Sequence, residues 1–181
     1  MPKKVLLIIA SQGYQPIEFN EPRKLLQENG FQVFTASDKS GQAVASDGST
    51  VVVDYTLEKV NPDKFDAVFV IGGSGALEHL DNPETYRIVQ DIDKDMYKAL
   101  GAICISTRIL ANAGVLQFRR VTGWDGDNKL ADILKKVGAT YVKTGVVVDD
   151  NLVTAIGPDS AKDFAQAIVD LLEQPTVQEA I

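Results

Sequence analysis

Short runs of apolar residues recur along this chain, and most are followed by a segment with helical character. The first run is Lys4 to Ala10 (KVLLIIA), and a similar run spans Phe65 to Ile71 (FDAVFVI). Runs of this length and composition are typical of parallel strands that are covered on both faces. Strands that alternate with helices build a layered α/β domain. We therefore expect an α/β fold, a three-layer α/β/α sandwich around a mostly parallel sheet.

The remaining patterns extend this alternation along the chain. We expect helices over Pro16 to Asn29, Pro83 to Leu100, the segment after Cys104, Asp127 to Val137, and Asp159 or Ser160 to Leu172. We expect further strands at Phe31 to Ala36, Ala102 to Ile103, Thr140 to Val142, Gly145 to Val148 and Leu152 to Ala155. Gly101 is expected to end the second helix, Ser11 to Tyr14 to form a turn, and Gln174 to Ile181 to form a frayed tail.

The stretch Ala43 to Asp54 (AVASDGSTVVVD) has a different pattern. Two short β runs flank Asp47-Gly48, and this dipeptide is a strong hairpin signal. We therefore expect a small antiparallel hairpin attached to the α/β body. The chain shows no internal repeat or interdomain linker, so residues 1–181 are expected to form a single domain.

Charge and cysteine content limit the classes of function. The net charge of −7 argues against a nucleic-acid partner, which normally needs a basic face. We expect no membrane partner, because no apolar run approaches spanning length. The chain begins with a strand rather than a signal-peptide core, and its single Cys suits a reducing compartment, so we expect a cytoplasmic location. One Cys and one His cannot make a conventional zinc site, and we expect no metal or cofactor.

Cys104 stands where a short buried strand switches to a helix with no Gly or Pro between them. So abrupt a switch forces a tight turn and presents the side chain at its apex, as in a nucleophile elbow. Free N–H groups at the start of the helix favour an anion, so the thiol is expected to be more acidic than one in a core. The alternative is that Cys104 is a small buried hydrophobe.

Glu18 lies about one turn into the first expected helix, among apolar neighbours. Beside a thiolate, a carboxyl group at this place would keep its proton, through desolvation and like-charge repulsion. It could then donate a hydrogen bond to sulfur or move a proton in catalysis. The alternative is an exposed helix Glu favoured by the helix dipole. Glu21 is a weaker candidate of the same kind.

Three other features are candidates for the site. Gly72-Gly73-Ser74-Gly75 follows an apolar strand, and paired glycines let backbone N–H groups approach an oxyanion; a tight turn is the alternative. Trp124, with Asp125 and Asp127, is a candidate pocket wall, and the alternative is a core aromatic. His79 is expected at an exposed helix position, because nothing in the spacing brings it to the sulfur.

Taken together, these motifs resemble those of the ThiJ/PfpI superfamily, within the class I glutamine-amidotransferase-like, flavodoxin-like folds. The resemblance covers nearly the whole chain. It rests on Glu18, VFVIGGSGALEHL at Val68 to Leu80, AICISTRILANAGVL at Ala102 to Leu116, and the carboxy-terminal VVVDDNLVTAIGPDSAKDFAQAIVDLL from Val146.

The resemblance implies roles for particular residues. It makes Cys104 the elbow nucleophile and Glu18 the carboxyl group hydrogen-bonded to its sulfur. It assigns the oxyanion hole to the backbone N–H groups of Gly73 and Ile105. It also implies a homodimer. Gly72, Ser106, Thr107, Trp124 and Asp125 are expected to line the pocket.

The chain also departs from the superfamily pattern. Protease-like members carry His directly after the nucleophile, whereas this chain has Ile105, followed by Ser106-Thr107 in place of Gly-Pro. Another branch keeps a His in the stretch that matches Val121 to Asp125, where this chain has Trp124. A Cys–His dyad is therefore not expected, and neither is peptidase activity.

Two functions remain open from the sequence. In the first, Cys104 and Glu18 act on a small electrophile, as in a glyoxalase, a deglycase or an isonitrile hydratase. In the second, the protein is a non-catalytic oxidative-stress sensor or chaperone-like protein that acts through a Cys104 sulfinate. The expected partners are accordingly a small-molecule electrophile or an oxidant. A scaffold role with an unused cysteine is a third alternative.

Overall fold

Seven strands form the central sheet of the computed structural model, which describes residues 1–174. The strands are β1 (Lys4–Ile8), β3 (Gln32–Ser37), β6 (Tyr55–Thr56), β7 (Ala67–Val70), β8 (Ala99–Ile103), β11 (Val146–Asp149) and β12 (Leu152–Ala155). Their order is β11-β12-β8-β7-β1-β3-β6. Every neighbouring pair is parallel except β11 with β12. The mostly parallel sheet is therefore confirmed.

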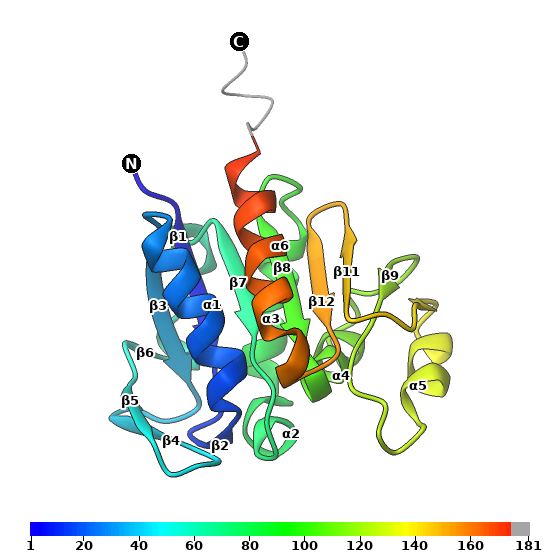
Figure 1. The fold of residues 1–181 in the computed structure, drawn as a ribbon, viewed down its shortest axis with the longest axis horizontal. Coiled ribbons are helices and arrows are strands. Elements are labelled where there is room, and N and C mark those ends of the chain that lie inside the picture. The colour runs from blue at the N-terminus through cyan, green and yellow to red at the C-terminus, as the bar shows by residue number, and fades with distance from the viewer. Residues whose placement is uncertain (175–181) are drawn as a thin grey trace.

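Helices cover both faces of this sheet (Figure 1). They are α1 (Pro16–Glu28), α2 (Ala76–Leu80), α3 (Pro83–Asp93), α4 (Thr107–Asn112), α5 (Leu130–Lys136) and α6 (Ala161–Glu173). Figure 1 shows α1 and α6 side by side in front of the sheet, and α3 and α4 pack against each other and against β8. Because both faces are covered, β7 and the part of β1 after Lys4 are fully buried, as their apolar sequences predict. The three-layer α/β/α sandwich is confirmed.

The expected hairpin is present at β4 (Gln42–Ala45) and β5 (Thr50–Val52), which pair antiparallel. The turn expected over Ser11 to Tyr14 is wrong, because Gln12–Tyr14 forms strand β2 and pairs in parallel with β4. The hairpin supplies backbone partners that local sequence does not show. Two more short strands, β9 (Arg120–Val121) and β10 (Thr140–Tyr141), form a separate pair.

The helix expected over Pro83 to Leu100 is too long, because α3 ends at Asp93. The Asp95 carboxylate accepts the backbone N–H of Tyr97 at 3.0 Å and starts a turn. Strand β8 then begins at Ala99, so Gly101 lies inside a strand and does not end a helix. The chain offers no Gly or Pro between Pro83 and this strand, which is why periodicity alone extended the helix.

The other elements follow expectation within one to three residues, including α1, whose C-terminal Gly30 has the left-handed φ of +81°. The expected tail from Gln174 lies, apart from that residue, outside the described part of the chain.

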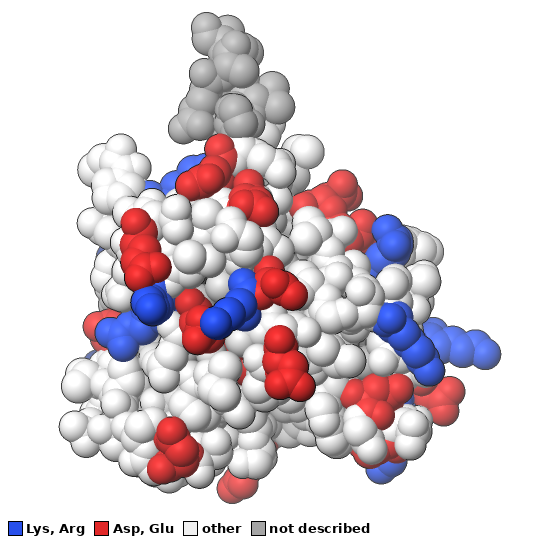
Figure 2. Space-filling model, in the orientation of Figure 1, with Lys and Arg blue, Asp and Glu red and all other residues white. Residues whose placement is uncertain are grey.

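Within residues 1–174, no helix is long and apolar enough to cross a membrane. Figure 2 shows acidic and basic side chains interspersed on the face that carries α1 and α6.

Gly101 provides a test of how tightly the sheet centre is packed. A Cβ at this position would lie 2.0 Å from the Val153 carbonyl oxygen and 2.8 Å from the Phe69 ring, and both are buried. We expect Gly101→Ala to lower the free energy of unfolding by about 3 kcal/mol, because neighbouring backbone cannot move aside cheaply. Denaturant unfolding of Gly101→Ala and wild type measures this loss.

Gly157→Ala is the matched control for this experiment. A Cβ there meets nothing within 4 Å, and the backbone φ of 165° is open to any residue. We expect a change within about 0.5 kcal/mol. Equal effects at the two glycines would contradict the tight packing between β8, β12 and β7.

Candidate functional site

Three chain segments meet at the carboxyl end of the parallel sheet, where α/β folds collect ligands. The segment after β1 leads into α1, and α1 carries Glu18 in its first turn. The glycine loop follows β7, and Cys104 follows β8. Because β1, β7 and β8 are adjacent and parallel, these segments share one edge of the sheet.

Cys104 occupies a left-handed backbone conformation with a φ of +65°. Strand β8 ends at Ile103, and a 3₁₀ turn over Cys104–Ser106 leads directly into α4. A positive φ is uncommon for a residue with a side chain and is a strained feature that clusters at functional sites. The tight strand-to-helix turn expected from the sequence is therefore present. Cys104 is partly buried at its apex.

Gly72 lies in the narrow space between Glu18 and Cys104. A Cβ on Gly72 would be 2.5 Å from Glu18 Oε2 and 2.6 Å from Cys104 Cβ. The Gly72 backbone N–H donates to Glu18 Oε2 at 2.9 Å. Only a residue without a side chain allows the carboxyl group and the elbow to approach this closely. The structure thus brings Glu18 and Cys104 together, as expected.

Glu18 is fully buried in α1, and this burial raises the pKa of its carboxyl group to about 7. Hydrogen bonds from the Cys104 thiol and the Gly72 N–H oppose the rise. Its second oxygen, Oε1, is buried without a hydrogen-bond partner. The alternative of an exposed helix Glu is wrong. Near pH 7, this carboxyl group can either hold or release a proton.

The Cys104 thiol has a raised pKa of about 12, which contradicts the expectation of an acidic thiol. Burial is the main cause, and the neighbouring Glu18 carboxylate adds to it by like-charge repulsion. Hydrogen bonds from the Ile105 and Gly73 backbone N–H groups act in the opposite direction. Above pH 7 the pair therefore holds its one negative charge on the carboxylate, and the sulfur stays protonated until a reaction needs it.

The hydroxyl groups that follow Ile105 hold the elbow in place. Ser106 Oγ donates to the Ile71 carbonyl at 2.7 Å, and Thr107 Oγ1 donates to the Thr122 carbonyl at 2.9 Å. Both side chains are fully buried. They therefore bind the elbow to the end of β7 and to the loop after β9, rather than facing solvent.

Trp124 and Asp125 lie on that loop. The Trp124 backbone N–H donates to the Cys104 carbonyl at 3.1 Å, and Trp124 keeps 37% of its surface exposed, so it is not a core aromatic. Asp125 Oδ1 accepts the backbone N–H of Leu130 at 2.8 Å, at the start of α5. This contact holds the loop against α5, and the pocket-lining role of Asp125 stays a prediction.

The whole chain was compared with known proteins. A model of the DJ-1/PfpI family matches residues 3–171. A deglycase of Pyrococcus abyssi is 34% identical over 93% of this chain and 99% of its own length. An uncharacterized protein of Methanocaldococcus jannaschii is 34% identical over 94% of this chain and 83% of its own. The chain belongs to the DJ-1/PfpI family.

Solved structures agree with this assignment. The ThiJ/PfpI domain protein from Brachyspira murdochii has a TM-score of 0.89 and 29% identity, and the match covers 97% of this chain and all of that one. Drosophila melanogaster DJ-1beta has a TM-score of 0.84 and 27% identity, over 99% of this chain and 95% of the other. The DJ-1/PfpI fold therefore extends over at least 97% of this chain.

The His79 side chain pairs with Asp38 in this DJ-1/PfpI protein. Its Nδ1 lies 2.9 Å from Asp38 Oδ2, and Ser11 Oγ donates to the same oxygen at 3.0 Å. The His79 side chain is only 14% exposed, so the expected exposed position is wrong. Sequence spacing could not show that the end of β3 supplies its carboxylate partner. The other weak candidate, Glu21, lies in the groove between α1 and α6 and not at the elbow.

The sequence offered Asp127 as part of a pocket wall, but it did not reveal Arg108 or the pairing of the two residues. Arg108 follows the elbow by four residues, and its guanidinium forms two hydrogen bonds to the Asp127 carboxylate. A separation of 19 residues carries no helical or strand periodicity, so no local signal could have joined them.

Over residues 1–174, no group of three or more His, Cys, Asp or Glu side chains is arranged to hold a metal ion.

Glu18→Gln tests the electrostatic coupling at the elbow. It removes the negative charge and keeps the size of the side chain. Because the Glu18 carboxylate raises the Cys104 thiol pKa, we expect that pKa to fall from about 12 by roughly one pH unit or more. The rate at which iodoacetamide alkylates the single thiol, followed as a function of pH, measures the change.

Glu21→Gln is the control, because it makes the same change three residues further along α1, in the groove facing α6. It should leave the titration of Cys104 unaltered. A Cys104 pKa that stays the same in Glu18→Gln would show that the two groups are not coupled.

Proposed function

We propose that this protein is a cysteine-dependent enzyme that acts on small electrophilic carbonyl compounds, in the glyoxalase or deglycase class. The observation that carries the proposal is the close approach of the Glu18 carboxyl group and the Cys104 elbow across Gly72. A nucleophile beside a base whose pKa of about 7 matches neutral pH suits proton-coupled addition to a carbonyl. Family members from Pyrococcus are named deglycases, which supports the same class.

The first step uses the protonated thiol as the structure presents it. Cys104 Sγ adds to the aldehyde carbon of an α-oxoaldehyde while the Glu18 carboxylate accepts the thiol proton. The new C–S bond leaves negative charge on the former carbonyl oxygen. Backbone N–H groups of Gly73 and Ile105, which already face the sulfur, are suited to stabilise that oxygen. The proton then passes from Glu18 to the oxygen and gives a hemithioacetal.

The second stage moves a proton between the two substrate carbons. The regenerated Glu18 carboxylate removes the proton from the carbon bonded to sulfur, which gives an enediolate. The hydroxyl proton on that carbon moves to the neighbouring oxygen, and Glu18 returns the abstracted proton to the neighbouring carbon, which leaves a thioester on Cys104. Water then cleaves the thioester and restores the thiol. With methylglyoxal the sum is one dicarbonyl plus one water to one lactate, and no oxidant or reductant is consumed.

This sequence of steps needs no imidazole. His79, the single histidine, is bound to Asp38, and Ile105 follows the nucleophile. Peptidase activity is therefore not proposed. Isonitriles are a second class of electrophile that the same thiol and carboxyl group could hydrate. We also propose that the protein acts as a homodimer in the cytoplasm.

A second candidate function is oxidation sensing through a Cys104 sulfinate. The unpartnered Glu18 Oε1 favours it, because a protonated carboxyl group could donate to a sulfinate oxygen. The raised pKa of Cys104 argues the other way, since the thiolate is the form that peroxide oxidises. We therefore place the enzyme first.

Turnover of methylglyoxal tests the enzyme. We expect lactate to form, and kcat/KM to rise with pH and level off above about 7, because the base must be ionised and its pKa is about 7. Cys104→Ser and Glu18→Gln should each lower kcat/KM by roughly 100-fold or more, whereas Glu21→Gln should not. Consumption of neither methylglyoxal nor a simple isonitrile above the Cys104→Ser background would remove the proposal.

Mild peroxide followed by intact-mass measurement tests the sensor. A sulfinate adds about 32 Da, roughly two oxygens, to the single thiol. Since the thiol pKa is raised, we expect slow oxidation in wild type and faster first-stage oxidation in Glu18→Gln, which has more thiolate. Rapid, stoichiometric sulfinate formation in wild type that is lost in Glu18→Gln would favour the sensor over the enzyme.

A further inference from the structure

Arg108 is a buried cation that no step of the proposed reaction uses. Its side chain is 10% exposed, and its two terminal nitrogens donate to the two Asp127 oxygens, at 3.0 Å from Nη1 and 2.5 Å from Nη2. These hydrogen bonds lower the pKa of Asp127 to about 2, so its carboxylate stays ionised at neutral pH. A two-pronged contact of this kind fixes geometry as well as charge.

The Arg108 guanidinium also lies under the ring of Trp124, with its central carbon 5.3 Å from the ring centroid. The backbone of Gly126 contacts the same indole, since a Cβ on Gly126 would be 2.5 Å from Trp124 Cζ2. The indole is thus contacted both by a guanidinium and by a glycine backbone. The part of Trp124 that remains exposed amounts to 37%.

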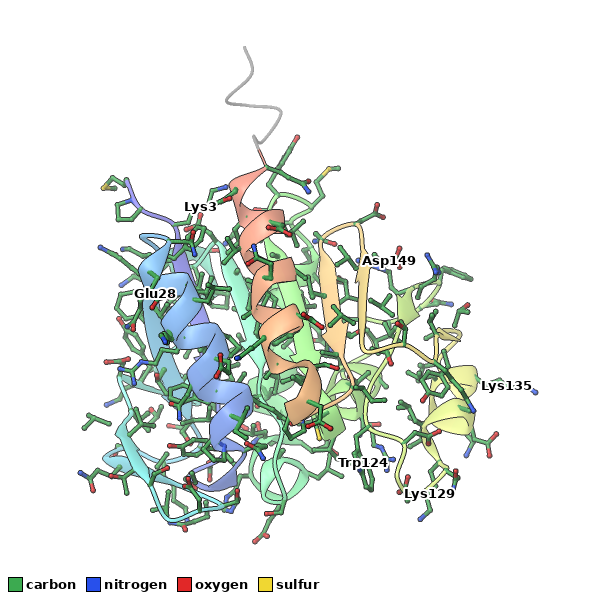
Figure 3. All side chains as sticks on the ribbon, viewed as in Figure 1. Lys3, Glu28, Trp124, Lys129, Lys135 and Asp149 are labelled. Carbon is green, nitrogen blue, oxygen red and sulfur yellow. The ribbon has the colours of Figure 1, made fainter. Side chains whose placement is uncertain are left out.

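The loop that carries Trp124 is bound at both of its ends to the first residues of α4. At its start, the Thr122 carbonyl accepts the Thr107 hydroxyl, and at its end Asp127 binds Arg108. Thr107 and Arg108 are neighbours in α4, directly after the elbow. Between these two points the Trp124 N–H binds the Cys104 carbonyl. Figure 3 shows Trp124 at the carboxyl edge of the sheet, opposite the end that carries Lys3.

We propose that Arg108 is a positioning residue that holds the Trp124 indole as an aromatic wall beside Cys104, and that this wall makes the site prefer electrophiles with an apolar or aromatic substituent. Arg108 acts through Asp127 and Trp124 and does not touch the reacting atoms. The substrate preference rests on the proposed function, whereas the placement of the indole does not.

Intrinsic fluorescence tests the placement, because Trp124 is the only Trp in the chain. In Arg108→Gln and Asp127→Asn we expect a red-shifted emission and roughly twofold stronger quenching by acrylamide, because the indole loses its stacked and anchored partner. The matched control is Arg119→Gln. Arg119 is comparably covered and binds Asp149 at the opposite edge of the sheet, so its loss should not alter the emission.

The preference is tested on wild type, Trp124→Ala, Trp124→Phe, Arg108→Gln and Asp127→Asn. We expect the ratio of kcat/KM for phenylglyoxal over methylglyoxal to fall about tenfold in Trp124→Ala and Arg108→Gln. The loss should lie in the KM for phenylglyoxal and should exceed any change for methylglyoxal, and Trp124→Phe should retain most of the ratio. A purely structural defect would lower kcat/KM for both substrates together.

A third measurement does not require turnover. The single thiol is alkylated with N-phenylmaleimide and with N-ethylmaleimide, and the rate ratio is compared among the same variants. Suppose that the wild type turns over no dicarbonyl, yet prefers N-phenylmaleimide, and that Arg108→Gln loses this preference. That result would overturn the proposed function and support this inference. Unchanged quenching and unchanged ratios in both Arg108→Gln and Asp127→Asn would overturn the inference. If Arg108→Gln does not fold, Asp127→Asn and Trp124→Ala decide the outcome.

Discussion

The chemistry of this molecule depends on one missing side chain. Gly72 lies where a single carbon would collide with both the Glu18 carboxylate and the Cys104 Cβ, and its N–H binds that carboxylate. The rest of the fold makes this approach possible, because adjacent parallel strands end at the same edge of the sheet. Because the Glu18 carboxyl group and the Cys104 thiol are in buried contact, a negative charge on one raises the pKa of the other, so one keeps its proton when the other has lost it. A base and a nucleophile with opposite protonation states are the result.

Much of the fold could be predicted from the sequence, because its information is local. The apolar runs of β1 and β7, the Asp47-Gly48 hairpin and the Gly30 stop all depend on residues within a few positions. The errors arose where a distant partner decides the structure. Strand β2 exists because the hairpin offers it backbone groups, and Gly101 belongs to a strand because β12 packs closely against it.

The candidate site, too, was predictable where its information is local and was not predictable where distant residues decide it. The turn at Cys104 was predictable from the abrupt change of pattern, and the burial of Glu18 could be stated only as one alternative. The acidity of the thiol was predicted in the wrong direction, since helix N–H groups were weighed without the desolvation and the carboxylate that outweigh them. The Arg108–Asp127 pair and the His79–Asp38 contact join elements far apart in sequence, and no local pattern encodes either.

The raised pKa of Glu18 also links the site to the stability of the whole domain. In the unfolded chain this carboxyl group titrates at its ordinary value near 4.5, whereas in the folded chain it titrates at about 7. The folded state therefore binds more protons between these two values, and the free energy of unfolding falls as the pH rises through them. The contribution is fully present below about pH 4.5 and is lost above about pH 7. The ionisation that prepares the base for reaction thus weakens the fold that holds it, so Glu18 contributes most to stability at the pH where it cannot act as a base.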